Sequence, residues 1–345
     1  MSEGKGERNL SLDVLRIVAT MAVIMLHVSS GGLDLQPLTA EWHVSNVYRA
    51  MVCWCVPAFV MISGSLFLSQ ERSVNIRRLY GHNILRIAIA YFVWAIVYIP
   101  IQAADSLSSS SLLAMLVIGP YHLWFLKMII GLYIVVPVLR RVTADRRTEE
   151  YFLCLSLLTA FLMPILLEII AIVDEGIGGV LSGVFDTFWL RLATGYTGYF
   201  VLGHYIVTYG IGRRTKIIVY TLGMFGTLLI IVGTSWLSLK NGVSSFMLYN
   251  ELTPLVLFQV TAIFVLFTSK EWPQLRRHQK YLTKLSNRTF AIYLIHVMVI
   301  ELMENSFLMT YSVATIPAYV IATFAISYAV ACVLAIIPGI KSYAV

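Results

Sequence analysis

The sequence predicts an all-α integral membrane protein, a polytopic bundle of about ten transmembrane helices with its N- and C-termini in the cytoplasm. Composition, the recurrence of apolar segments and the loop charges support this fold class. Hydrophobic residues make up 59% of the chain, charged residues make up 12%, and the mean hydropathy is +0.80. A soluble domain is roughly half apolar and a quarter charged. The composition therefore indicates lipid surroundings.

Apolar segments long enough to cross a bilayer, which takes about 20 helical residues, recur along the whole chain. The expected spans are residues 10–30, 46–68, 84–104, 122–140, 151–173, 187–209, 215–237, 252–269, 289–308 and 314–338. Residues 107–118 are apolar only in their second half, so we expect an interfacial segment there. No stretch is polar enough for a separate soluble domain, and residues 1–345 are expected to form a single membrane domain.

The basic residues test this count of spans, because Lys and Arg collect in cytoplasmic loops. With the N-terminus inside, 19 of the 25 basic residues fall on the cytoplasmic side, and the opposite loops hold only Lys240 and, at a helix end, Arg49. The net charge of +7 thus reflects topology, and there is no case for nucleic-acid binding. The longest loop, residues 268–288, is expected to be non-helical, and to set topology or to meet anionic lipid or an anionic substrate.

The cysteines and the N-terminus exclude other classes of protein. The four cysteines lie within apolar segments and lack metal-ligand spacing; they are Cys53, Cys55, Cys154 and Cys332. We therefore expect no disulfide framework and no metal site. The short polar N-terminus is followed by a span without a small-residue cleavage site, so that span is expected to be retained.

The first span carries the strongest functional signal, because Asp13, Arg16 and His27 share one helical face. The eleven-residue step from Arg16 to His27 is about three turns, or about 16 Å along the axis. Ionisable groups within a span face protein or a water-filled cavity and are by default functional candidates. The alternative is an interfacial Asp13–Arg16 pair whose arginine reaches the headgroups, with His27 inert near the far interface.

The third span begins with a group of cations, Arg77, Arg78, His82 and Arg86, just inside the cytoplasmic interface. A phosphate-rich ligand suits this group, because the planar guanidinium donates two parallel charge-assisted hydrogen bonds. Topology alone accounts for Arg77 and Arg78. Arg86 lies a turn or more deeper, and is a candidate for either role.

Three further cationic or titratable residues lie within later spans: His122, Lys127 and His296. His122 and Lys127 fall in the outer half of the fourth span, where Lys127 either reaches outward or finds a partner. His296 lies near the middle of its span, with no interface within reach. Each taken singly is as well explained by a structural role as by catalysis.

Taken together, three histidines and several arginines within the spans suit an anionic ligand better than a proton-coupled cation pathway. A histidine titrates near neutral pH and can activate a hydroxyl for acyl transfer as a general base. Arginine and lysine can hold phosphates or stabilise an oxyanion.

Four segments resemble the motifs of a known family, the acyltransferase 3 family. LDVLRIVATMAVIMLH resembles its first-helix motif, PAFVMISGSLFL its second-helix segment, GPYHLWFLKMIIGLYIVVP its fourth-helix motif and SNRTFAIYLIHVMVI its late motif. The resemblance covers nearly the whole chain, in order, and implies a membrane O-acyltransferase. It also implies a bacterial inner-membrane location, and short members look like the O-acetyltransferase of enterobacterial common antigen.

The resemblance implies a role for several residues. His27 matches the catalytic histidine and Arg16 its paired arginine; Arg16, Arg86 and Arg78 are expected to bind the donor, acetyl-CoA. This chain has Asn83 where a further arginine is expected. Supporting or substrate-contacting roles are expected for Asp13, His122, Lys127 and His296. The acceptor is expected to be a carbohydrate or a lipid-linked glycan, and no permanently bound cofactor is expected.

Two other functions remain open at this point. The membrane domain of some membrane-bound serine racemases resembles the same family and has been assigned to amino-acid uptake, but no racemase domain is present in this sequence. A structural subunit of a polysaccharide-export assembly would need neither Arg16 nor His27 on one buried face.

Overall fold

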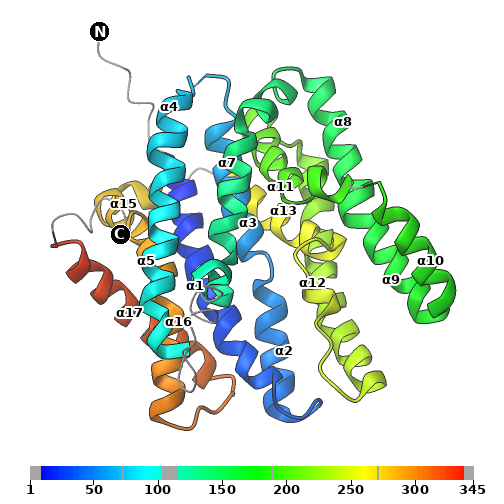
Figure 1. The fold of residues 1–345 in the computed structure, drawn as a ribbon, viewed down its shortest axis with the longest axis vertical. Helices are drawn as coiled ribbons and strands as arrows, with labels where there is room; N and C mark the ends of the chain where they lie inside the picture. Colours follow the sequence, from blue (N-terminus) through cyan, green and yellow to red (C-terminus); the bar gives the residue numbers. More distant parts are fainter. Residues whose placement is uncertain (1–8, 72, 103–115, 189, 270–271, 338–345) are drawn as a thin grey trace.

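The computed structural model describes residues 9–71, 73–102, 116–188, 190–269 and 272–337, and their regular structure is helical throughout (Figure 1). Most of the expected interfacial segment 107–118 lies outside the described residues. The first half of the chain forms α1 (Leu10–Leu33), α2 (Ala40–Val52), α3 (Cys55–Phe67), α4 (Ile76–Arg78), the π-helix η1 (Leu79–Ile84), α5 (Leu85–Gln102), the 3₁₀ turn η2 (Tyr121–Leu123), α7 (Trp124–Val142), α8 (Arg146–Ser156), the π-helix η3 (Leu157–Leu162) and α9 (Met163–Val173).

The second half forms α10 (Glu175–Asp186), α11 (Leu190–Tyr209), α12 (Arg213–Asn241), the 3₁₀ turn η4 (Met247–Tyr249), α13 (Pro254–Thr268), α14 (Pro273–Arg276), α15 (Gln279–Ser286), α16 (Thr289–Ser306) and α17 (Thr315–Leu334). Eight helical segments of the described chain are long and apolar enough to cross a membrane, and a ninth is the pair α15–α16, bent by 57°. These nine match nine of the ten expected spans, and α11 occupies the tenth. The chain is an all-α, multi-pass membrane protein.

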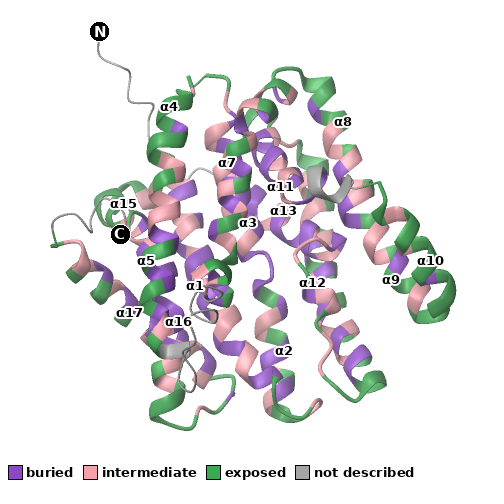
Figure 2. Ribbon diagram, in the orientation of Figure 1, coloured by how far each residue is buried: buried purple, intermediate pink, exposed green. Residues whose placement is uncertain are grey.

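The first helix lies in the middle of the bundle, as Figure 1 shows. It begins at Asn9, whose side chain accepts hydrogen bonds from the backbone N–H groups of Ser11 and Leu12. Such a cap satisfies N–H groups that have no partner within the helix. α1 packs against α2, α3, α13, α15, α16 and α17, and much of it is buried (Figure 2). Its polar side chains are therefore held within protein.

Glycines allow α3 and α11 to approach closely. A Cβ built on Gly64 would lie 1.8 Å from the carbonyl oxygen of Phe200, and one on Gly203 would lie 2.1 Å from that of Met61. Small residues at helix crossings are typical of membrane bundles, where backbone contact replaces the hydrophobic driving force. This contact fixes α3, which forms one wall of the pocket described below.

Two regions differ from the sequence expectation. The expectation of a non-helical loop at 268–288 is wrong, because α14 and α15 form there. α15 packs against α1, with Leu282 and Leu285 half-buried and Lys284 exposed. The short helix α10 was not expected. Asp174 caps it by accepting a hydrogen bond from the Ile177 N–H at 2.9 Å, and α10 packs against α9.

Candidate functional site

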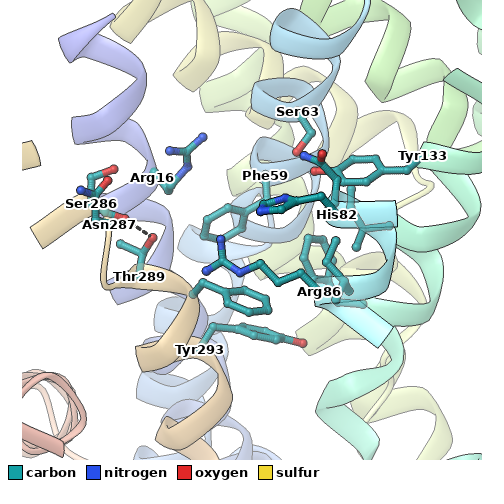
Figure 3. Close-up of a pocket in the computed structure, with 15 residues that line it drawn as sticks. Arg16, Phe59, Ser63, His82, Arg86, Tyr133, Ser286, Asn287, Thr289 and Tyr293 are labelled. Atoms are coloured by element: carbon teal, nitrogen blue, oxygen red, sulfur yellow. Dashed lines mark hydrogen bonds between the residues drawn. The ribbon is translucent and has the colours of Figure 1, made fainter. Parts of the chain in front are cut away.

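A pocket of about 350 Å³ opens in the half of the bundle predicted to face the cytoplasm (Figure 3). Each wall is one face of a helix, with contributing residues spaced by three or four positions. The pocket is lined by Arg16 of α1; Phe59 and Ser63 of α3; His82, Asn83, Arg86 and Ile87 of η1–α5; Phe125, Ile129 and Tyr133 of α7; and Ser286, Asn287, Thr289, Phe290 and Tyr293 around the α15–α16 bend.

Arg16 enters the pocket from α1 and is oriented by a buried carboxylate. The Arg16 Nη1 atom lies 3.6 Å from Asp13 Oδ1. The same Asp13 oxygen accepts a hydrogen bond from the Ser286 hydroxyl at 2.8 Å. Asp13 and Arg16 therefore face each other on α1, and α15 supplies a partner that the sequence did not indicate. Asp13 serves to hold Arg16 and does not line the pocket itself.

Arg86 enters from α5, and its guanidinium lies over the ring of Phe290, 5.6 Å from the ring centroid. His82 and Asn83 lie on the same helical face, one turn earlier. Figure 3 shows Arg16 and Arg86 reaching the pocket from different helices. The lining residues include two guanidinium groups and no carboxylate. This lining suits an anionic ligand.

The three predicted histidines gather next to Tyr293, which lines the pocket. The ring centroids of His27 and His296 are 5.1 Å apart, and those of His122 and His296 are 5.7 Å apart. The Tyr121 hydroxyl lies 3.4 Å from His27 Nδ1. Three helical segments distant in sequence, namely α1, η2 and α16, thus form one histidine cluster, defined as His27, His122 and His296.

Burial divides this cluster. His122 and His296 are almost fully buried, whereas His27 is half-buried and its neighbour Tyr121 is 59% exposed. His296 donates from Nδ1 to the carbonyl oxygen of Tyr293 at 2.6 Å, and its buried Nε2 has no hydrogen-bond partner among the described residues. Of the three, His27 is therefore the histidine that keeps an exposed surface.

Arg49, on α2, was read from the sequence only as a charge at a helix end. Its guanidinium donates to the carbonyl oxygen of Leu26 at 3.3 Å and to the Ser30 hydroxyl, beside the turn of α1 that carries His27. It also lies 5.1 Å from the ring centroid of Tyr249. The sequence signal was that this cation stands on the side of the membrane where basic residues are rare.

Two residues expected at the site lie apart from both the pocket and the histidine cluster. Arg78 is exposed and does not line the pocket. Lys127 donates to the carbonyl oxygen of Ile118 at 2.8 Å and lies 5.6 Å from the ring centroid of Tyr91, so it has found a structural partner. A functional role for either residue stays a prediction.

Sequence reasoning missed the pocket walls supplied by α3 and α7, and it gave Tyr293 no role beyond its place in the late motif. Ser63 and Tyr133 carry no charge and have no distinctive spacing. Tyr293 lies one helical turn before His296, and that spacing was the available signal. Among the described residues, no group of three or more His, Cys, Asp or Glu side chains is arranged to hold a metal ion.

Comparison with known proteins identifies the family. A family model described as an acyltransferase domain matches residues 9–335. No curated protein and no solved structure gives a significant match. The matched region contains the pocket, the histidine cluster and every helix of the described chain. Because the match covers nearly the whole sequence, the chain belongs to the acyltransferase 3 family and is a membrane acyltransferase.

Proposed function

We propose that this protein is an O-acetyltransferase of a bacterial inner membrane. It takes acetyl from cytoplasmic acetyl-CoA and places it on a hydroxyl of a cell-surface polysaccharide or of its lipid-linked precursor. One observation carries the proposal: α1 presents Arg16 to a cationic pocket at one end and His27 to the histidine cluster at the other.

The donor fits the pocket through its phosphates. Arg16 and Arg86 would hold them by charge-assisted hydrogen bonds, with Asp13 keeping Arg16 in place. From Arg16 to His27 is about 16 Å along α1, which is comparable to the reach of an extended pantetheine arm. The thioester would therefore meet His27 while the nucleotide part of the donor remains near the cytoplasmic surface.

His27 would act as the general base. One ring nitrogen takes the proton of the acceptor hydroxyl as its oxygen attacks the thioester carbonyl carbon. The resulting tetrahedral intermediate carries an oxyanion, and the C–S bond then breaks. The CoA thiolate takes the proton back from the His27 imidazolium. The products are the acetyl ester of the acceptor and free CoA, so atoms and charges balance.

Transfer of label from the donor to glycan tests this function. Membrane vesicles from otherwise matched strains with and without the gene are incubated with acetyl-CoA labelled in the acetyl group, and the glycan fraction is analysed by mass spectrometry. We expect ester-linked label in the glycan only when the protein is present. Folded protein without such label would overturn the proposal, and protein-dependent uptake of serine by the vesicles would favour the transport function in its place.

A further inference from the structure

We propose that the ring of Tyr293 is a side wall of the route from the donor pocket to the histidine cluster, and that this wall restricts the donor to a short acyl group. The inference rests on the proposed function, and it adds the residue that sets the acyl-chain length. Tyr293 lines the pocket and also contacts two members of the histidine cluster, His122 and His296. Figure 3 shows its ring at the end of the pocket below Arg86.

Tyr293 is fixed on several sides. Its hydroxyl donates to the carbonyl oxygen of His122, and its own carbonyl oxygen accepts from His296 Nδ1 at 2.6 Å. Its ring centroid lies 5.6 Å from that of Phe125 and 5.6 Å from that of His296. The side chain is almost fully buried. A ring held in this way by hydrogen bonds and by packing is a rigid boundary, because close-packed protein interiors deform little.

The wall stands where the acyl group must arrive. His27 is not among the residues that line the pocket, but Tyr293 lines it and packs against His296, the ring next to His27. A thioester extending from Arg16 toward His27 therefore brings its acyl group against the Tyr293 ring. An acetyl group adds one methyl beyond the carbonyl. Each further methylene has to displace a ring that is anchored to His122.

The ring, and not the hydroxyl, would set the limit. Tyr293→Phe keeps the ring and loses only the hydrogen bond to His122, so its preference for short acyl groups should stay close to that of the wild type. Tyr293→Ala removes the wall and leaves room for several methylenes. Tyr293→Leu shortens the wall while keeping an apolar contact with Phe125. It replaces Tyr293→Ala in the experiment if the alanine variant is not recovered as folded protein.

Calorimetry on the purified full-length protein tests this inference without requiring the acceptor. The dissociation constants of acetyl-CoA and butyryl-CoA are measured for the wild type and for the Tyr293 variants. We expect the wild type to prefer acetyl-CoA by about tenfold or more, since one methylene in a shaped pocket is discriminated by about 10–200-fold. Tyr293→Ala should bring the two affinities to within about threefold of each other, by removing that restriction.

Tyr133→Ala is the matched control. Tyr133 also lines the pocket, two helical turns beyond Phe125 on α7, and its ring packs against Phe67 at 4.5 Å between centroids. This variant should change both affinities in parallel and leave their ratio at the wild-type value. Acetyl-CoA binding with a ratio unaffected by Tyr293→Ala and Tyr293→Leu overturns this inference alone. A wild type that binds no acyl-CoA overturns the proposed function and this inference with it.

Discussion

His27 and His296 lie with their ring centroids 5.1 Å apart, although one belongs to the first helix and the other to α16, near the end of the chain. Their contact depends on α1 packing directly against α16. Tyr98 of α5 holds the turns of α16 that flank His296. Its hydroxyl donates to the carbonyl oxygen of Leu294 and accepts from the N–H of Met298, each at 3.0 Å. The histidine cluster is therefore a product of tertiary packing.

Removal of either pocket arginine should weaken donor binding. Charge-assisted hydrogen bonds contribute about 1.5–3 kcal/mol each, so Arg16→Ala and Arg86→Ala should each raise the dissociation constant of acetyl-CoA by about 10–100-fold. Isothermal titration calorimetry measures this directly. Arg213→Ala is the control, because Arg213 is an exposed arginine at the start of α12 and does not line the pocket. Unchanged affinity in both pocket variants would contradict the assignment of the donor site.

Asp13→Ala should reduce both stability and donor affinity. The substitution leaves the Ser286 hydroxyl without its partner and removes the carboxylate beside Arg16. An orphaned buried polar group costs about 1–3 kcal/mol, so the melting temperature in detergent should fall. Asp13→Asn keeps an oxygen for Ser286 and should restore most of the stability while donor affinity stays reduced. Equal affinity in all three proteins would show that Asp13 does not orient Arg16.

Gly64→Ala should disrupt the α3–α11 contact. The added methyl would meet the carbonyl oxygen of Phe200 at 1.8 Å, so one helix must shift. Overpacking of this kind typically costs about 1–3 kcal/mol or more. Gly131→Ala on α7 is the matched control, because its added Cβ has nothing within 4 Å. Thermal melting should show a clear loss for the first variant and no loss for the second; equal melting temperatures would contradict the observed packing.

Labelling of the termini and of one outer loop tests the predicted sidedness. Fusion reporters at the N- and C-termini should report the cytoplasm, because basic residues collect on that side. A reporter inserted at 242–246, the loop after α12, should report the outside. A cytoplasmic signal from that loop would place His27 on the wrong side for an outer acceptor.

The sequence was sufficient for the helices whose signal is local. A long apolar segment identifies a span because every backbone polar group must be satisfied within it. The spacing of Arg16 and His27 on α1 likewise follows from helical periodicity alone. α10 was missed because a short helix packed on its neighbour, as at Gly178 against Ala171, carries no signal of spanning length. α15 was missed because its basic residues were attributed to topology.

The site was predictable only where charge marks it. Arg16, Arg86, His27 and His296 stand out because ionisable groups are costly inside a membrane. Tyr293 is an ordinary residue of an apolar helix, and its place between the pocket and the histidine cluster depends on how α16 packs against α7. Which residues of α3 and α7 face the pocket depends on helix rotation, and no local pattern in the sequence fixes that rotation.

The general base gives the most direct test of the account. Acetyl transfer from labelled acetyl-CoA to glycan is measured in membrane vesicles that contain equal amounts of wild-type, His27→Gln or His43→Gln protein. Loss of a general base costs about 10²–10⁴-fold in rate, so His27→Gln should lower transfer by that factor while acetyl-CoA affinity stays near the wild-type value. His43, an exposed histidine of α2, is the control and should be dispensable. Near-wild-type transfer by His27→Gln would contradict the account and leave His27 with a structural role.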